Sequence, residues 1–150
     1  MGKFLQGTFE PKHPEKYVGD STKIRYRSSW EKFAMLKFDE NPSIIKWNSE
    51  EKVIPYYSPV DGKMHRYFPD FIIQVKDVNG KIWQYMIEIK PHCQTILPKQ
   101  TKNKKPKRLQ EEVETFVINS AKWSAAREFC KRNSMEFKIM TEHDLNMPGK

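Results

Sequence analysis

The chain has 150 residues, of which 37% are hydrophobic and 13% aromatic, and its formal net charge is +8. This length suits a single domain that can form a core without a disulfide or metal staple, and two cysteines are too few for a disulfide framework. No apolar run approaches the roughly 20 residues of a membrane span, and the N-terminus lacks an apolar leader, so we expect a soluble, intracellular protein without membrane contact.

The N-terminal third predicts an arm, a helix and two short strands. Residues 1–20 contain three glycines and two prolines and predict an irregular arm. We expect a first helix that begins within residues 21–29 and ends near Phe38, because Asn41-Pro42 is a strong stop signal. Two β-prone runs follow at residues 44–47 and 53–57, and Pro55 marks the second as an edge or bulged strand.

The sequence then predicts a β-hairpin whose register matters for function. Two apolar runs flank Asn79-Gly80, and a three-residue loop with Gly80 in the left-handed conformation pairs positions whose numbers sum to 158. This register sets Phe71 opposite Ile87 on an apolar face that also includes the hairpin's Trp and Tyr residues. It sets Asp70 opposite Glu88 on the other face.

A basic loop is expected next, over residues 91–108. The sequence between Glu88 and Glu111 has no acidic residue, and its lysines and arginine supply seven of the eight excess charges. Six of them are candidates for DNA contacts: Lys99, Lys102, Lys104, Lys105, Lys107 and Arg108. Dense basic charge without acidic partners is typical of phosphate-backbone binding, although a solvated linker has the same composition.

The C-terminal part predicts a long helix and a final strand. Apolar residues recur at every fourth position over residues 109–132, namely Val113, Val117, Ala121, Ala125 and Phe129. Residues 135–140 predict the last strand. The order of helix, strands, helix and strand predicts one α/β (α+β) domain over residues 1–150, with a central mixed sheet flanked by helices.

Asp70, Glu88 and Lys90 are the candidate catalytic residues. The predicted register brings the two carboxylates together, and the period of two in a strand places Lys90 on the face of Glu88. Adjacent carboxylates repel, so a divalent cation is the natural counter-charge, and oxygen ligands favour Mg²⁺, with Mn²⁺ as a substitute. This combination suits phosphodiester hydrolysis. The structural alternative is a turn residue beside an ordinary strand end.

Glu31 is a further candidate with an equally good structural explanation. Ser28 and Glu31 have the spacing of a capping box, in which the glutamate accepts a hydrogen bond from a backbone amide at the helix start. Alternatively, Glu31 points from the helix toward Asp70 and Glu88 and holds a metal-bound water or a second cation. The residues alone leave both interpretations open.

Several motifs together resemble a known nuclease superfamily. They are Arg27-Ser28-Ser29-Trp30-Glu31, Asn41-Pro42, Ile54-Pro55-Tyr56, Tyr67-x-Pro69-Asp70-Phe71, Glu88-Ile89-Lys90-Pro91 and Phe137-x-Ile139-x-Thr141-Glu142. This set resembles the PD-(D/E)xK nucleases, in particular the branch with a TnsA-like endonuclease N-terminal domain and, within it, the head completion nucleases of T-even-type tailed phages.

The resemblance implies a restriction-endonuclease-like core and Mg²⁺-dependent cleavage of DNA. It assigns Glu31, Asp70, Glu88 and Lys90 to the active site, with Asp70, Glu88, the Ile89 carbonyl and also Glu31 as metal ligands. Gln94 and Lys122 are additional candidates for contacts with DNA. The implied partners are DNA and phage head or neck proteins, in the host cytoplasm during assembly or in the virion. The alternative is a non-catalytic DNA-binding component of the head or neck.

Overall fold

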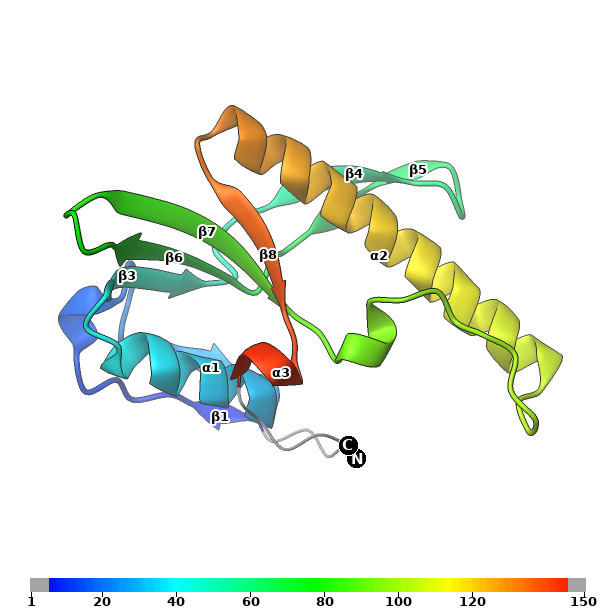
Figure 1. The fold of residues 1–150 in the computed structure, drawn as a ribbon, viewed down its shortest axis with the longest axis horizontal. Coiled ribbons are helices and arrows are strands. Elements are labelled where there is room, and N and C mark those ends of the chain that lie inside the picture. The colour runs from blue at the N-terminus through cyan, green and yellow to red at the C-terminus, as the bar shows by residue number, and fades with distance from the viewer. Residues whose placement is uncertain (1–5, 146–150) are drawn as a thin grey trace.

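The computed structural model describes residues 6–145, which form a four-stranded sheet, a separate hairpin, two main helices and several short elements (Figure 1). This described part contains eight strands: β1 (Gly7–Thr8), β2 (Arg25–Tyr26), β3 (Ile44–Ser49), β4 (Ile54–Ser58), β5 (Lys63–Tyr67), β6 (Phe71–Lys76), β7 (Ile82–Ile89) and β8 (Glu136–Met140). The α-helices are α1 (Ser29–Glu40), α2 (Pro106–Arg132) and α3 (Glu142–Leu145), and the 3₁₀ turns are η1 (Pro14–Lys16) and η2 (His92–Gln94).

The central sheet is mixed and lies between two helical layers, as the sequence predicts. Its strand order is β3-β6-β7-β8, with antiparallel pairs up to β7 and a parallel β7–β8 pair. On one face, Phe71 and Ile87 pack with α1 and the N-terminal segment. On the other face, Met86 packs with Trp123 of α2 and with the β4–β5 hairpin. Both faces of the sheet are therefore covered, which fixes the strand ends in space (Figure 1).

The predicted hairpin register is confirmed. Phe71 pairs with Ile87, Gln74 pairs with Gln84, and Gly80 has a positive φ of 84°. The prediction that all hairpin aromatics lie in the core is wrong for Trp83, which is 37% exposed. Trp83 lies next to the turn of the hairpin, and its indole N–H donates to Asp77 Oδ2 at 2.9 Å.

The N-terminal segment is mostly irregular over residues 6–20, but it packs against the fold; residues 1–5 lie outside the described part of the chain. The segment contains β1 and η1, and it is held by the buried Asp39 carboxylate, which accepts hydrogen bonds from the amides of Lys12 (2.7 Å) and His13 (3.0 Å). Lys16 Nζ donates to three carbonyl oxygens at the end of α1, including that of Phe38 at 2.6 Å. These contacts offset the unpaired carbonyls of a helix C-terminus.

The β4–β5 hairpin forms its own two-stranded sheet against α2. Pro55 lies on β4 opposite Arg66, in agreement with the edge position expected for a proline. The sequence analysis did not predict β5, because Lys63–Tyr67 has no apolar alternation: four of its five residues are exposed. The hairpin leads directly into Asp70, so it connects the outer layer to the strand ends.

Helix α2 begins earlier than predicted. Pro106 occupies its first turn, where proline is favoured because its missing N–H would be unpaired anyway. The basic loop therefore ends at Lys105, and Lys107 and Arg108 are helical. The buried residues of α2 are Asn119, Trp123, Ala126 and Cys130. Of the predicted series, Ala121, Ala125 and Phe129 are partly buried and pack against the same core cluster.

The burial of α2 follows from its position. Its N-terminal half extends past the sheet and lies beside the basic segment, residues 91–105 (Figure 1), so its apolar residues there are only partly covered. Helix α1 ends two residues later than predicted, at Glu40. None of the helices described here is long and apolar enough to cross a membrane.

Candidate active site

Three neighbouring strands bring acidic residues together at one edge of the central sheet. Glu50 follows β3, Asp70 precedes β6 and Glu88 lies near the end of β7. The Glu50 amide donates to the Asp70 carbonyl at 3.1 Å, and the Ile89 amide donates to Asp70 Oδ2 at 2.7 Å. The backbone pairing thus fixes the order of the three acids, as the hairpin register predicted for Asp70 and Glu88.

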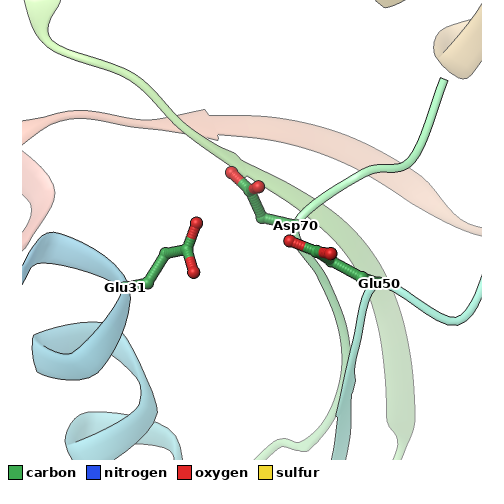
Figure 2. Close-up of side chains that lie close together, drawn as sticks. All are labelled: Glu31, Glu50 and Asp70. Carbon is green, nitrogen blue, oxygen red and sulfur yellow. The ribbon is translucent and has the colours of Figure 1, made fainter. Parts of the chain in front are cut away.

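Within the described residues 6–145, Glu31, Glu50 and Asp70 form a close carboxylate group. Each offers an oxygen that lies within 4.8 Å of the others, and all three residues are partly buried. Figure 2 shows the three carboxylates directed toward a common space, with Glu31 approaching from α1 and the other two from the strand ends. Three carboxylates at this separation repel one another and have the chemistry of a hard-cation site.

Glu31 combines both interpretations that the sequence left open. Its amide donates to the Ser28 Oγ at 3.1 Å, and its Oε1 accepts from the Arg27 amide at 2.9 Å. The cap therefore exists, with Arg27 in place of the expected Ser28 as the amide donor. Because the same carboxylate belongs to the close group, the cap also holds Glu31 in its orientation toward Asp70.

Sequence reasoning missed Glu50. Its side chain pairs with Arg27 Nη2 at 2.9 Å, and its backbone has a positive φ of 54°, which is uncommon for a residue other than glycine. The available signal was positional: Glu50 follows a strand run that pairs with the strand after Asp70. The pairing of β3 with β6 could not be deduced from local spacing, so Glu50 looked like one of several exposed acids.

Glu88 lies beside this group but outside it. The residue is buried, and its carboxylate accepts a hydrogen bond from Tyr67 Oη at 2.5 Å through Oε1. Lys90 Nζ lies 3.6 Å from the other oxygen, Oε2, so Glu88 and Lys90 do share a face as predicted. Glu88 is therefore oriented by a phenol and an ammonium group.

Burial and mutual repulsion disfavour negative charge at this site. Desolvation raises the pKa of Asp70 well above its usual range, and the Glu88 carboxylate raises it further. Desolvation also raises the pKa of Glu88, against the opposing effects of Tyr67 and Lys90. The pKa of Glu50 is raised by burial, with Arg27 acting in the opposite direction. The donor set fits a divalent cation, because such an ion would offset the charges that burial makes costly.

Lys122, one of the two additional candidates from the sequence, faces this site from α2. Its Nζ lies 5.7 Å from the centroid of the Tyr67 ring and 5.9 Å from that of Tyr56, and its charge lowers the pKa of Glu88. Gln94, the other additional candidate, lies instead in η2 and lines a cavity of about 690 Å³ between the basic segment and α2.

The predicted DNA-binding residues differ in whether their charges are paired within the fold. Lys104 Nζ pairs with Glu112 Oε1 at 2.7 Å and donates to the Lys99 carbonyl at 2.6 Å, and Arg108 Nε pairs with Glu112 Oε2 at 3.1 Å. These two charges are partly neutralised within the fold. The side chains of the other four, Lys99, Lys102, Lys105 and Lys107, are exposed.

A mixed sheet between helices, with acids and a lysine at its strand ends, defines a restriction-endonuclease-like fold. A family model for the TnsA-like endonuclease N-terminal domain matches residues 41–142. The chain is also 41% identical over 146 residues to the head completion nuclease of Enterobacteria phage T4, and the match covers 95% of each protein. The chain belongs to this TnsA-like endonuclease family.

Proposed function

We propose that the protein is a Mg²⁺-dependent DNA endonuclease that acts in phage head completion. The observation that carries this proposal is the group of Glu31, Glu50 and Asp70, whose carboxylate oxygens lie within 4.8 Å of one another beside Glu88 and Lys90. Family membership and the name of the phage T4 relative support the nuclease activity and the stage of assembly.

The residues have distinct roles in this proposal. Asp70, Glu31 and Glu50 would hold the metal, with Glu88 and the Ile89 carbonyl as further oxygen donors. When bound, Mg²⁺ supplies charge neutralisation at the scissile phosphate and activation of water, as in other metal-dependent phosphodiesterases. Mn²⁺ would substitute for it, because both ions prefer oxygen ligands.

The other groups position the substrate. The Lys90 ammonium, 3.6 Å from Glu88 Oε2, would donate to a non-bridging oxygen of the scissile phosphate. Tyr67 Oη holds the Glu88 carboxylate, so that this group can accept a proton at Oε2 without losing its orientation. The exposed lysines of the basic segment would bind flanking phosphates and hold the DNA against the acids.

The proposed cellular role rests on the family match and on the name of the phage T4 relative. The partners would be packaged DNA and proteins of the head or neck, and the protein would act in the infected host cytoplasm or as part of the virion. A non-catalytic DNA-binding component of the head is the competing function, and a cleavage assay separates the two.

The test is nicking of supercoiled plasmid DNA in Mg²⁺ or Mn²⁺. The wild type should nick the plasmid, while Asp70→Asn and Lys90→Ala should each reduce the rate by roughly 100-fold or more. Glu114→Gln and Lys131→Ala, at exposed positions of α2, are the matched controls and should retain the wild-type rate. A wild type that binds DNA but never cuts it would establish the non-catalytic function instead.

A further inference from the structure

The outer face of the β4–β5 hairpin carries exposed apolar residues that the proposed active site does not use. One side of the hairpin packs on α2 through Ile54, Tyr56 and Tyr67. The alternate positions, Val53, Pro55, Tyr57, Met64, Arg66 and Phe68, are all exposed, and among them Tyr57 is 58% and Met64 63% exposed. This face contains one cation and no acid.

The end of this face adjoins the acidic site. Burial alternates along the connection: Arg66 and Phe68 are exposed, Tyr67 and Pro69 are buried, and Asp70 is partly exposed. Phe68 is two residues from Asp70, so their Cα atoms are at most about 7 Å apart. The exposed Phe68 side chain is therefore anchored within about two residues' length of the acidic site, within reach of the nucleotide next to a phosphate bound at Asp70.

The residues on both sides of Phe68 are tied to the fold, which restrains its backbone. Tyr67 on one side is buried and bonded to Glu88, and Pro69 on the other side is fully buried. Proline restricts the residue before it to extended conformations, which limits the directions open to Phe68. The Arg66 guanidinium lies 5.8 Å from the Phe68 ring centroid, so a planar cation and an aromatic ring form one unit.

We propose that Arg66 and Phe68 form a stacking site for an unpaired nucleotide next to the scissile phosphate. This inference rests on the proposed function and specifies its substrate class: DNA with unpaired bases, such as a single strand, a flap or a frayed end. Aromatic rings that are open to solvent beside a cation bind bases by stacking, which requires that the base is not paired in a duplex. Stacking also tolerates every base, so the site implies little sequence preference.

A protein partner is the competing occupant of this face. Tyr, Phe, Met and Arg are enriched in protein interfaces, and the outer end of the hairpin has this composition. The position of Phe68 and Arg66 beside the acids favours DNA, because a protein that covered this end would also obstruct access to Asp70.

The test uses oligonucleotides that carry 2-aminopurine, whose fluorescence falls when it stacks. Binding is measured in an Asp70→Asn background to prevent cleavage, with a single strand and a blunt duplex of the same sequence. Phe68→Ala should weaken single-strand binding about 5- to 100-fold and abolish the fluorescence change, whereas Phe68→Trp should retain both. Arg66→Ala should give a smaller loss of the same kind.

The control is Trp83→Leu, which removes a partly exposed aromatic residue about 16 Å along β7 from Glu88 and should change neither signal. In the proteins with Asp70 intact, Phe68→Ala should reduce cleavage of the single strand more than that of the duplex. Equal effects on both substrates, or an unchanged 2-aminopurine signal in Phe68→Ala, would overturn the inference. If the wild type cuts neither substrate but still shows Phe68-dependent stacking, the inference stands and the proposed catalysis fails.

Discussion

The acidic site and the basic segment of residues 91–105 are held in place by different means. Asp70 and Glu50 are fixed by backbone pairing between adjacent strands, and a slip of one residue would send their side chains to the opposite face. The basic segment has no strand and one short 3₁₀ turn, and it is anchored to α2 mainly through Lys104. Sheet register therefore sets the geometry that cleavage needs, whereas charge density suffices for holding DNA.

The largest effects should come from single changes in the acidic site. Glu31→Gln and Glu50→Gln should each lower the rate of plasmid nicking roughly 10- to 100-fold and raise the Mg²⁺ concentration required, because each removes one charge from the carboxylate group. Glu51→Gln, at the exposed neighbouring position, is the matched control and should leave both quantities unchanged. A full rate for Glu50→Gln at limiting Mg²⁺ would remove Glu50 from the site.

The basic segment should respond in a graded manner. Replacement of Lys99, Lys102, Lys105 and Lys107 by glutamine should weaken DNA binding and reduce the slope of log affinity against log salt by about 3 to 4, through lost counterion release. The rate of cleavage at saturating protein should persist. Fluorescence anisotropy at several salt concentrations measures the slope, and an unchanged slope would show that DNA does not contact these lysines.

Stability should change in the opposite direction from activity at Asp70. Because burial raises the pKa of this carboxyl in the folded state, the folded protein binds the proton more tightly than the unfolded chain does. The contribution of Asp70 to stability should therefore fall as pH rises from about 4, its unfolded pKa, through the raised folded pKa. In metal-free buffer at neutral pH, Asp70→Asn should melt at a higher temperature than the wild type.

Asp77→Asn provides a control of opposite sign. The hydrogen bond from Trp83 and the amides of the turn lower the pKa of Asp77, so its contribution to stability is present above its unfolded pKa and is lost as pH falls through the lowered folded value. Thermal unfolding from pH 3 to pH 8 measures both variants. If Asp70→Asn loses stability at neutral pH as Asp77→Asn does, the carboxylates are not strained by burial.

The smallest expected effect concerns Lys104. Its Nζ is bonded to Glu112 and to the Lys99 carbonyl, and its side chain is 11% exposed. Lys104→Met should lower the free energy of unfolding by about 1 kcal/mol. Lys102→Met, at an exposed position, should have almost no effect. Equal melting temperatures for the two variants would show that the segment is not anchored through Lys104.

Local sequence patterns predicted the hairpin register and the bounds of α1, because both depend on residues that are close together in the chain. The hairpin register followed from Gly80 and the matching of apolar faces, and it placed Asp70 beside Glu88 and Lys90 on the face of Glu88. The stop at Asn41-Pro42 and the capping position of Ser28 bounded α1 closely. The mixed sheet followed from the order of the elements.

The features that local patterns did not show depend on contacts between distant segments. Glu50, which was not predicted, joins the acids only because β3 pairs with β6. The N-terminal segment is ordered by Asp39, a charged residue near the end of α1 that gave no local sign of being buried. In each case, contacts between residues that are far apart in the sequence set the position, and spacing along the chain could not predict it.

The central claim is that the carboxylate group at the strand ends is a divalent-cation site that serves DNA cleavage. Calorimetric titration of Mn²⁺ into the metal-free wild type and into Asp70→Asn tests it most directly, with Glu114→Gln as the control. The wild type and the control should show saturable binding that Asp70→Asn loses. Equal Mn²⁺ binding by Asp70→Asn and the wild type would contradict the assignment of this site.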